Sequence, residues 1–143
     1  MPDARIATVR PVAESEAKGQ VAAIFNDIKA TKKLDAVPNF WRVLAANPDH
    51  LEMVWTRLKA LMHPEAVGRQ VKLEPTVREI IALAVSATNG CAYCINSHTA
   101  ALRKLGMNAE TLGEVLAIVG LFNTTNKLAD GYQVVPDVLP PVD

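Results

Sequence analysis

The sequence has few aromatic residues, few cysteines and no excess of either charge, and each scarcity excludes classes of protein. Only 5% of its 143 residues are aromatic although 50% are hydrophobic. The interior must therefore be mainly aliphatic, which favours packed helices over an all-β fold. Fifteen basic residues balance fifteen acidic ones, and no basic run is present that would neutralise a line of phosphates. A nucleic acid is not expected as a partner.

Long hydrophobic runs are also missing. The longest, at 80–87, is eight residues long and includes Ser86, whereas a membrane-spanning helix needs roughly 20 apolar residues. The first eleven residues show no apolar stretch typical of a secretory signal. We therefore expect a cytoplasmic protein that has no membrane partner.

The length and the apolar periodicity predict an all-α, single-domain helical bundle of about six helices. A chain of this size can bury about 70% of its unfolded surface around one core. We expect one domain over 1–143, with an N-terminal arm at 1–12, a motif-bearing core at 74–126 and an extended, proline-containing arm at 131–143. The expected helices cover 13–33, 39–46, 48–62, 75–88, 91–105 and a segment that follows 108.

Capping residues and helix faces refine this expectation. Asn39, Pro48 and Asn108 are placed where helices begin, and Gly90 is placed where the fourth helix ends. The fourth helix carries little polar surface after its first turn, so we expect it to be buried on most sides. The sixth helix is apolar on two sides, which is typical of a subunit contact.

The only two cysteines, Cys91 and Cys94, indicate the chemistry. A reducing compartment would not preserve a purely structural disulfide, so this C-x-x-C pair is expected to be redox-active or metal-binding. At about 100° per residue, both sulfur atoms and the imidazole of His98 share one face of a helix. Cys94 and His98 are i, i+4 neighbours, which is close enough for proton exchange.

Two features would favour the thiolate that acts as the nucleophile. The dipole of a helix N-terminus stabilises negative charge on cysteines in the first turn. His98 can accept the proton of Cys94, provided that a third group orients its ring. Glu79, on the preceding apolar helix, is the candidate for that group. Proximity to His98 favours Cys94 as the attacking sulfur, while Cys91 is favoured as the one that a reductant reaches, so spacing alone leaves the order of attack open.

Simpler interpretations apply to each residue taken separately. Glu79 could be a solvated first-turn carboxylate, His98 a surface histidine, and the cysteines small buried hydrophobic residues. Their joint occurrence at one helix start favours a functional site. A structural zinc site needs four ligands, and this segment offers three, so neither a metal nor another cofactor is expected.

The motif resembles a known family. The residues Arg78-Glu79 and Asn89-Gly90-Cys91-Ala92-Tyr93-Cys94, followed by His98, are similar to the alkylhydroperoxidase D branch of the carboxymuconolactone decarboxylase family. The resemblance covers about 74–122, and the run at 37–48 is similar to the upstream helices of peroxidase-related members. It implies an all-helical homo-oligomer, a trimer or a hexamer, with active sites near the subunit contacts.

The same resemblance implies a thiol peroxidase acting on hydroperoxides. Cys94 would attack the peroxide and become a sulfenic acid, Cys91 would condense with it, and an external dithiol, such as a lipoyl group or a thioredoxin-like partner, would restore both thiols. Glu79 and His98 match the proton relay. The best-studied branch has a histidine between the cysteines, where this sequence has Tyr93, so the relay would be shorter or would use the phenol.

Two other functions are considered beside the peroxidase. The first is a metal-binding or structural interaction module, in which the helices serve assembly. The second is a cofactor-free lactone decarboxylase-type enzyme. Members that decarboxylate a muconolactone lack the cysteine pair, so the presence of this pair argues against that reaction.

Overall fold

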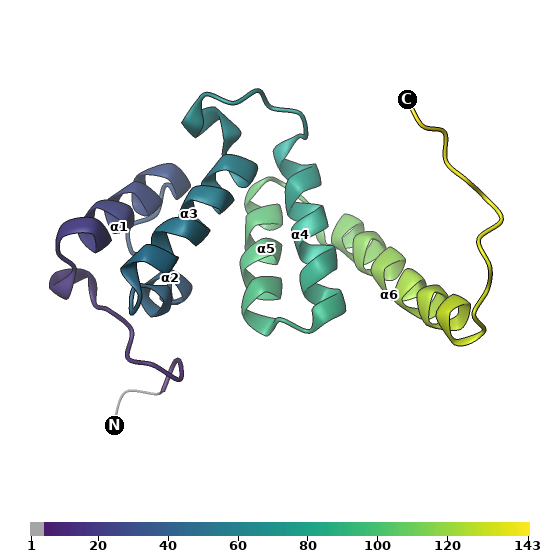
Figure 1. Cartoon of the computed structure of the whole chain (residues 1–143), viewed down its shortest axis with the longest axis horizontal. Coiled ribbons are helices and arrows are strands. Elements are labelled where there is room, and N and C mark those ends of the chain that lie inside the picture. The colour runs from purple at the N-terminus through teal and green to yellow at the C-terminus, as the bar shows by residue number, and fades with distance from the viewer. Residues whose placement is uncertain (1–4) are drawn as a thin grey trace. The chain divides into compact units, whose positions relative to one another are not determined.

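The computed structural model describes residues 5–143, which contain helices and turns but no strand (Figure 1). The chain divides into two compact units, Met1–Lys72 and Leu73–Asp143, called unit 1 and unit 2 below. The expected all-α bundle of about six helices is confirmed, whereas the expected domain boundaries stay predictions. No helix in residues 5–143 combines the length and the apolar character needed to cross a membrane.

Unit 1 holds three α-helices and two short 3-10 turns. Its elements are η1 (Glu14–Glu16), α1 (Gly19–Lys32), α2 (Asn39–Leu44), α3 (Pro48–Met62) and η2 (Pro64–Val67). The single helix predicted over 13–33 is wrong at its start, because Ala17 and Lys18 are extended and Gly19 has a φ of 51°. A left-handed glycine at this point starts α1 anew instead of continuing the turn before it.

The helix boundaries near residues 38–50 follow local capping chemistry. The predicted cap at Asn39 is wrong, because Pro38 occupies the capping position and the Asn39 side chain accepts a hydrogen bond from Arg42 Nη1 at 3.3 Å. Pro48 does open α3, as predicted, and Asn47 Oδ1 accepts the backbone N–H of His50 at 3.2 Å. Proline is tolerated there because the first N–H of a helix has no partner within it.

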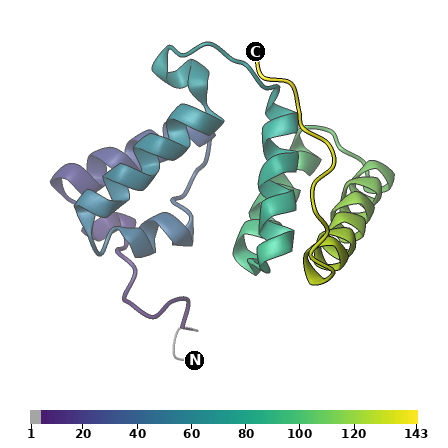
Figure 2. The same cartoon turned by 45° about the vertical axis from the view of Figure 1, so that its right-hand side comes forward.

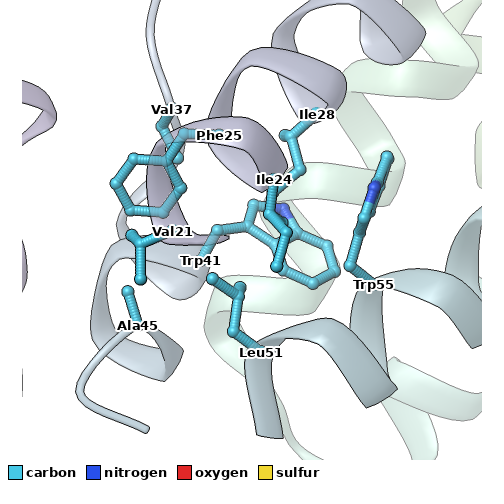
Figure 3. Packing of buried hydrophobic residues seen from close by; sticks show 9 residues of the cluster. All are labelled: Val21, Ile24, Phe25, Ile28, Val37, Trp41, Ala45, Leu51 and Trp55. Atoms are coloured by element: carbon cyan, nitrogen blue, oxygen red, sulfur yellow. The ribbon is translucent and has the colours of Figure 1, made fainter. Parts of the chain in front are cut away.

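The hydrophobic core of unit 1 is shown in Figure 3. The rings of Trp41 and Trp55 pack edge to face with their centroids 5.2 Å apart. Trp55 Nε1 donates to Asp27 Oδ2 at 2.7 Å, and Lys59 Nζ donates to both carboxylate oxygens of Asp27. Burial alone would raise the pKa of Asp27, but the hydrogen bonds from Lys59 and Trp55 outweigh it and hold this pKa below its ordinary value. The buried cluster consists of Val21, Ile24, Phe25, Ile28, Val37, Trp41, Ala45, Leu51 and Trp55.

Unit 2 consists of three helices and the C-terminal segment. The helices are α4 (Pro75–Asn89), α5 (Ala92–Lys104) and α6 (Ala109–Gly131), and residues 134–143 follow without regular structure (Figures 1 and 2). The predicted cap of α6 is confirmed, because Asn108 Oδ1 accepts the backbone N–H of Thr111 at 2.8 Å. Helix α6 ends at Gly131, the first residue of the arm expected over 131–143, and this arm stays a prediction.

The expectation that α4 is buried on most sides is wrong. Val77, Ile81 and Val85 are 41%, 49% and 54% exposed. Within unit 2, α4 packs against α5 and α6, yet these two neighbours leave the three side chains exposed. The apolar pattern of a helix therefore predicts which face favours burial, but it does not identify the element that packs against that face.

Candidate redox site

The site lies on the hairpin of α4 and α5, two helices that Figure 1 shows side by side. Gly90 ends α4 with a φ of 72°, the left-handed conformation that glycine adopts without strain. The backbone N–H of Cys91 then donates to the Ser86 carbonyl at 3.0 Å. This tight turn reverses the chain and places the start of α5 beside the end of α4.

Cys91 and Cys94 meet at the N-terminus of α5. Cys91 is the capping residue, and its Sγ accepts the backbone N–H of Cys94 at 3.3 Å. The two residues form a disulfide with their Cα atoms 5.3 Å apart. The first turn of α5 contains no acidic residue, so the free N–H groups and the helix dipole favour negative charge on sulfur once the bond is reduced.

Glu79 of α4 and His98 of α5 are in direct contact. Glu79 Oε2 lies 2.7 Å from His98 Nδ1, and the two side chains are 19% and 27% exposed. With Nδ1–H donating to the carboxylate, Nε2 of the neutral ring is left as the acceptor. The structure thus brings together the carboxylate and the imidazole that the sequence singles out.

The other sequence-based assignments concern the first turn of α5. His98 stands one turn after Cys94 on this helix, which is the spacing that allows proton exchange. Tyr93, between the two cysteines, is 44% exposed. Exchange between His98 and Cys94 and a role for the Tyr93 phenol stay predictions.

A hollow of about 230 Å³ lies between α4 and α6. Ala84 and Thr88 contribute to it from α4. At about 100° per residue these positions lie roughly 140° and 180° around the helix from Glu79. The hollow is therefore on the opposite side of α4 from the Glu79–His98 pair, and it is not assigned as the peroxide pocket. Its lining residues are Ala84, Thr88, Ile118, Val119, Phe122, Asn123 and Asn126.

Arg78, the residue before Glu79, is buried although its position in the sequence suggests no role for it. Arg78 is only 8% exposed, and its Nε and Nη1 atoms are buried without a hydrogen-bond partner. A charged residue in the first turn of a helix is usually solvated, so the burial of Arg78 could not be predicted from the sequence pattern.

The metal-binding alternative would need a cluster of ligand side chains, and none is present in the described part of the chain. Among residues 5–143, no three or more His, Cys, Asp or Glu side chains gather as they would around a metal ion. A closed zinc site requires four such ligands in tetrahedral geometry.

Fold and site together define an all-helical protein in which a C-x-x-C pair at a helix start accompanies a carboxylate–imidazole pair. A sequence model of the carboxymuconolactone decarboxylase family matches residues 48–136. The chain belongs to this family, and its similarities place it in the branch related to AhpD.

Individual relatives support this placement. The crystal structure of the alkylhydroperoxidase AhpD core from Rhodospirillum rubrum is 42% identical, with a TM-score of 0.84 over 93% of this chain and 96% of that one. The alkyl hydroperoxide reductase AhpD of Streptomyces griseus is 29% identical over 87% of this chain and 69% of its own length. AhpD of Brucella canis is 33% identical over 76% of this chain and 61% of its own length.

Proposed function

We propose that this protein is a thiol-dependent peroxidase of the alkylhydroperoxidase type. The observation that carries the proposal is the placement of a bridged cysteine pair at the start of α5, one turn before a histidine that a carboxylate holds at 2.7 Å. The relatives named AhpD support the same reaction class. Its partners are a hydroperoxide and an external dithiol.

The first step is attack of the Cys94 thiolate on the terminal oxygen of a hydroperoxide. The O–O bond breaks and an S–O bond forms, so that Cys94 becomes a sulfenic acid and the peroxide leaves as an alcohol after taking up one proton. His98 accepts the thiol proton at Nε2 and returns it to the leaving oxygen. Glu79 stabilises the imidazolium that exists between these two events.

The second step closes the disulfide that the structure contains. The Cys91 thiol attacks the sulfenic sulfur, the S–O bond breaks, and water leaves with the Cys91 proton. An external dithiol, a lipoyl group or a thioredoxin-like protein, then exchanges with the disulfide and leaves in its oxidised form. We assign Tyr93 to the same turn as a further proton donor, because it stands where the best-studied branch has a histidine.

The oligomeric state and the cellular location of the protein belong to the same proposal. We expect a homo-oligomer, a trimer or a hexamer, and a cytoplasmic location, where reduced dithiols are available. Neither a metal nor another cofactor is required by the reaction as written, because electrons pass only between peroxide, protein sulfur and the external dithiol.

A peroxide panel tests the proposed function. The reduced protein is mixed with hydrogen peroxide, tert-butyl hydroperoxide or cumene hydroperoxide, and with dihydrolipoamide or thioredoxin as the reductant. We expect catalytic loss of at least one organic hydroperoxide, and none after both thiols are alkylated. Consumption that survives alkylation would refute the thiol mechanism, and turnover of a lactone by the alkylated protein would favour the decarboxylase-type reaction instead.

A further inference from the structure

Ser86 is a buried polar residue that the proposed reaction does not use. It is only 7% exposed, and it is the one polar residue in the apolar run at 80–87 of α4. Serine is a weaker helix former than alanine, because its hydroxyl competes for backbone groups. The stability of the helix alone would therefore favour an apolar side chain at this position.

The hydroxyl of Ser86 makes a hydrogen bond that it can exchange at low cost. Ser86 Oγ donates to the Ala82 carbonyl at 2.6 Å. In the regular pattern of the α-helix, this carbonyl also accepts the backbone N–H of Ser86. The carbonyl therefore keeps a partner when the hydroxyl turns away, and rotation about one side-chain bond is enough to turn it.

Two contacts fix the register of the α4–α5 hairpin. Glu79 Oε2 lies 2.7 Å from His98 Nδ1, and the backbone N–H of Cys91 donates to the Ser86 carbonyl at 3.0 Å. Ser86 follows Glu79 by seven residues, and Cys91 precedes His98 by seven. Seven residues are about two helical turns, so Ser86 lies roughly 20° around α4 from Glu79. We therefore place the Ser86 side chain opposite Cys91, as the Glu79 side chain is opposite His98.

The sulfur of Cys91 accepts one hydrogen bond from a fixed donor in the structure. The backbone N–H of Cys94 donates to Cys91 Sγ at 3.3 Å. When the disulfide is open, the thiolate and not the thiol is the reactive form of a cysteine. A hydrogen bond to an ionised acceptor is stronger than one to a neutral acceptor, so each further donor raises the fraction of thiolate.

We propose that the Ser86 hydroxyl donates a hydrogen bond to the Cys91 thiolate once the disulfide is reduced. The hydroxyl then moves from the Ala82 carbonyl to the sulfur, and it prepares Cys91 for the second step of the reaction. Ser86 keeps its own proton throughout, so it acts as a hydrogen-bond donor and not as an acid.

The step that Ser86 assists balances without an outside reagent. The Cys91 thiolate attacks the sulfenic sulfur of Cys94, and the S–S bond forms as the S–O bond breaks. The departing hydroxide takes up the proton that Cys91 had released, and water results. The sulfur of Cys91 is oxidised and the sulfur of Cys94 is reduced. Only this step rests on the proposed function, because the ionisation of Cys91 can be measured without peroxide.

The other ionisable groups around Cys91 stay the same in the comparison that tests the role of Ser86. They come from α5 itself and from α4, the helix packed against it. A difference between two proteins that share these groups is therefore due to the Ser86 hydroxyl. The groups are Tyr93, Cys94 and His98 on α5, and Arg78 and Glu79 on α4.

The test is a pH titration of thiolate absorbance in the reduced full chain carrying Cys94→Ala, in which Cys91 is the only thiol. Adding Ser86→Ala should move the titration midpoint to higher pH by about one unit, because the thiolate loses a donor. Ser86→Thr keeps a hydroxyl and should retain the midpoint of the parent. Ser97→Ala, at an exposed position of α5, is the matched control and should also titrate as the parent does.

The rate of disulfide closure gives a second readout in the chain that keeps both cysteines. A midpoint higher by one unit leaves about tenfold less thiolate at neutral pH, which the greater nucleophilicity of the more basic sulfur partly offsets. Closure after one equivalent of hydroperoxide should therefore be roughly threefold slower in Ser86→Ala. The preceding loss of peroxide, which Cys94 carries out, should keep its rate.

Three results would overturn the role of Ser86. They are an unchanged midpoint in Ser86→Ala, an equal shift in Ser97→Ala, and closure of Ser86→Ala at the wild-type rate. If Ser86→Thr does not fold, the comparison of Ser86→Ala with Ser97→Ala decides the question. A folded Ser86→Thr whose midpoint shifts as far as that of Ser86→Ala would also overturn it.

Peroxide consumption by the wild-type chain separates this failure from that of the proposed function. An unchanged midpoint in a protein that consumes peroxide removes only the role of Ser86. The expected shift in a protein that consumes no peroxide removes only the peroxidase, and the hydrogen bond from Ser86 to the Cys91 thiolate stands.

Discussion

Replacing Glu79 by glutamine tests the proton relay with the smallest change in shape. Glutamine keeps an oxygen that can accept from His98 Nδ1, but it removes the negative charge that stabilises the imidazolium. The fold should persist, because both side chains lie on the α4–α5 hairpin and no atom is lost from the contact. The rate of peroxide consumption should fall while the disulfide can still form.

The structure sets the size of this effect. Glu79 and His98 are 19% and 27% exposed and 2.7 Å apart, so solvent screens their interaction only in part. A hydrogen bond to a charged group contributes about 1.5–3 kcal/mol, and a neutral one about 0.5–1.5 kcal/mol. A difference of about 1–1.5 kcal/mol corresponds to a roughly 5- to 13-fold slower reaction. Glu79→Ala, which removes the bond altogether, should slow it roughly 10-fold or more.

The assay is the single-turnover rate of peroxide consumption by the reduced protein, so that regeneration by the external dithiol does not enter. Glu74→Gln is the matched control, because Glu74 is the capping residue at the start of the same helix, lies roughly 140° around it from Glu79 at about 100° per residue, and makes no capping hydrogen bond with its side chain. We expect this control to react at the wild-type rate. An unchanged rate in Glu79→Gln, or an equal loss in both variants, would refute the relay.

Three further predictions concern the sulfur chemistry and the stability of each unit. Cys94→Ser should reduce dithiol-driven peroxide loss to the level of a protein-free blank, because no thiolate remains beside His98 to form the sulfenic acid. Asp27→Ala should lower the free energy of unfolding by about 1–3 kcal/mol in urea titrations, since it leaves the buried indole N–H of Trp55 unpaired. Because the pKa of Asp27 is held below its ordinary value of 3.8, this contribution should be complete above that pH and vanish as the pH falls through the lowered value. Gly90→Ala should destabilise by about 1 kcal/mol, because a Cβ there meets no atom within 4 Å and only the left-handed φ of 72° is unfavourable.

Each of these predictions has a result that contradicts it. Peroxide turnover by Cys94→Ser would move the attack to Cys91. Two results would show that the Asp27 carboxylate does not stabilise unit 1. One is equal free energies of unfolding for wild type and Asp27→Ala at neutral pH, and the other is a loss of stability in Asp27→Ala that persists unchanged in strong acid. Gly113→Ala on α6, where a Cβ also meets no atom within 4 Å, is the control for Gly90→Ala and should not destabilise the protein. Equal losses of unfolding free energy in Gly90→Ala and Gly113→Ala would show that the loss does not arise from the turn at Gly90.

The features that could be predicted from the sequence depend on neighbours in the chain. Pro48, Gly90 and Asn108 mark helix ends through the backbone groups that they free or satisfy, and each is found where the pattern placed it. The contact between Glu79 and His98 follows from the tight hairpin, which leaves little freedom in how α4 and α5 align. Local chemistry therefore decides these features before tertiary packing acts.

The features that could not be predicted depend on contacts distant in the sequence. The break at Ala17 and Lys18 interrupts a pattern that is typical of a continuous helix. The turn before this break makes contacts distant in the sequence, because Glu14 accepts hydrogen bonds from Lys29 Nζ and from the backbone N–H of Val37. The exposure of Ile81 and the burial of Arg78 reverse the usual behaviour of their residue types. The exposure of each of these side chains depends on which groups pack against α4, and the hydrophobic periodicity of the sequence does not identify those groups.

The central claim is that a hydroperoxide oxidises the reduced pair Cys91 and Cys94 to the disulfide. The most direct test is intact-mass measurement of the fully reduced protein after one equivalent of an organic hydroperoxide, with the alcohol product measured in the same sample. We expect the loss of two hydrogen atoms from the protein, one alcohol formed for each disulfide, and recovery of the original mass on adding a dithiol. An unchanged mass with the peroxide intact, or alcohol formed without any disulfide, would contradict it.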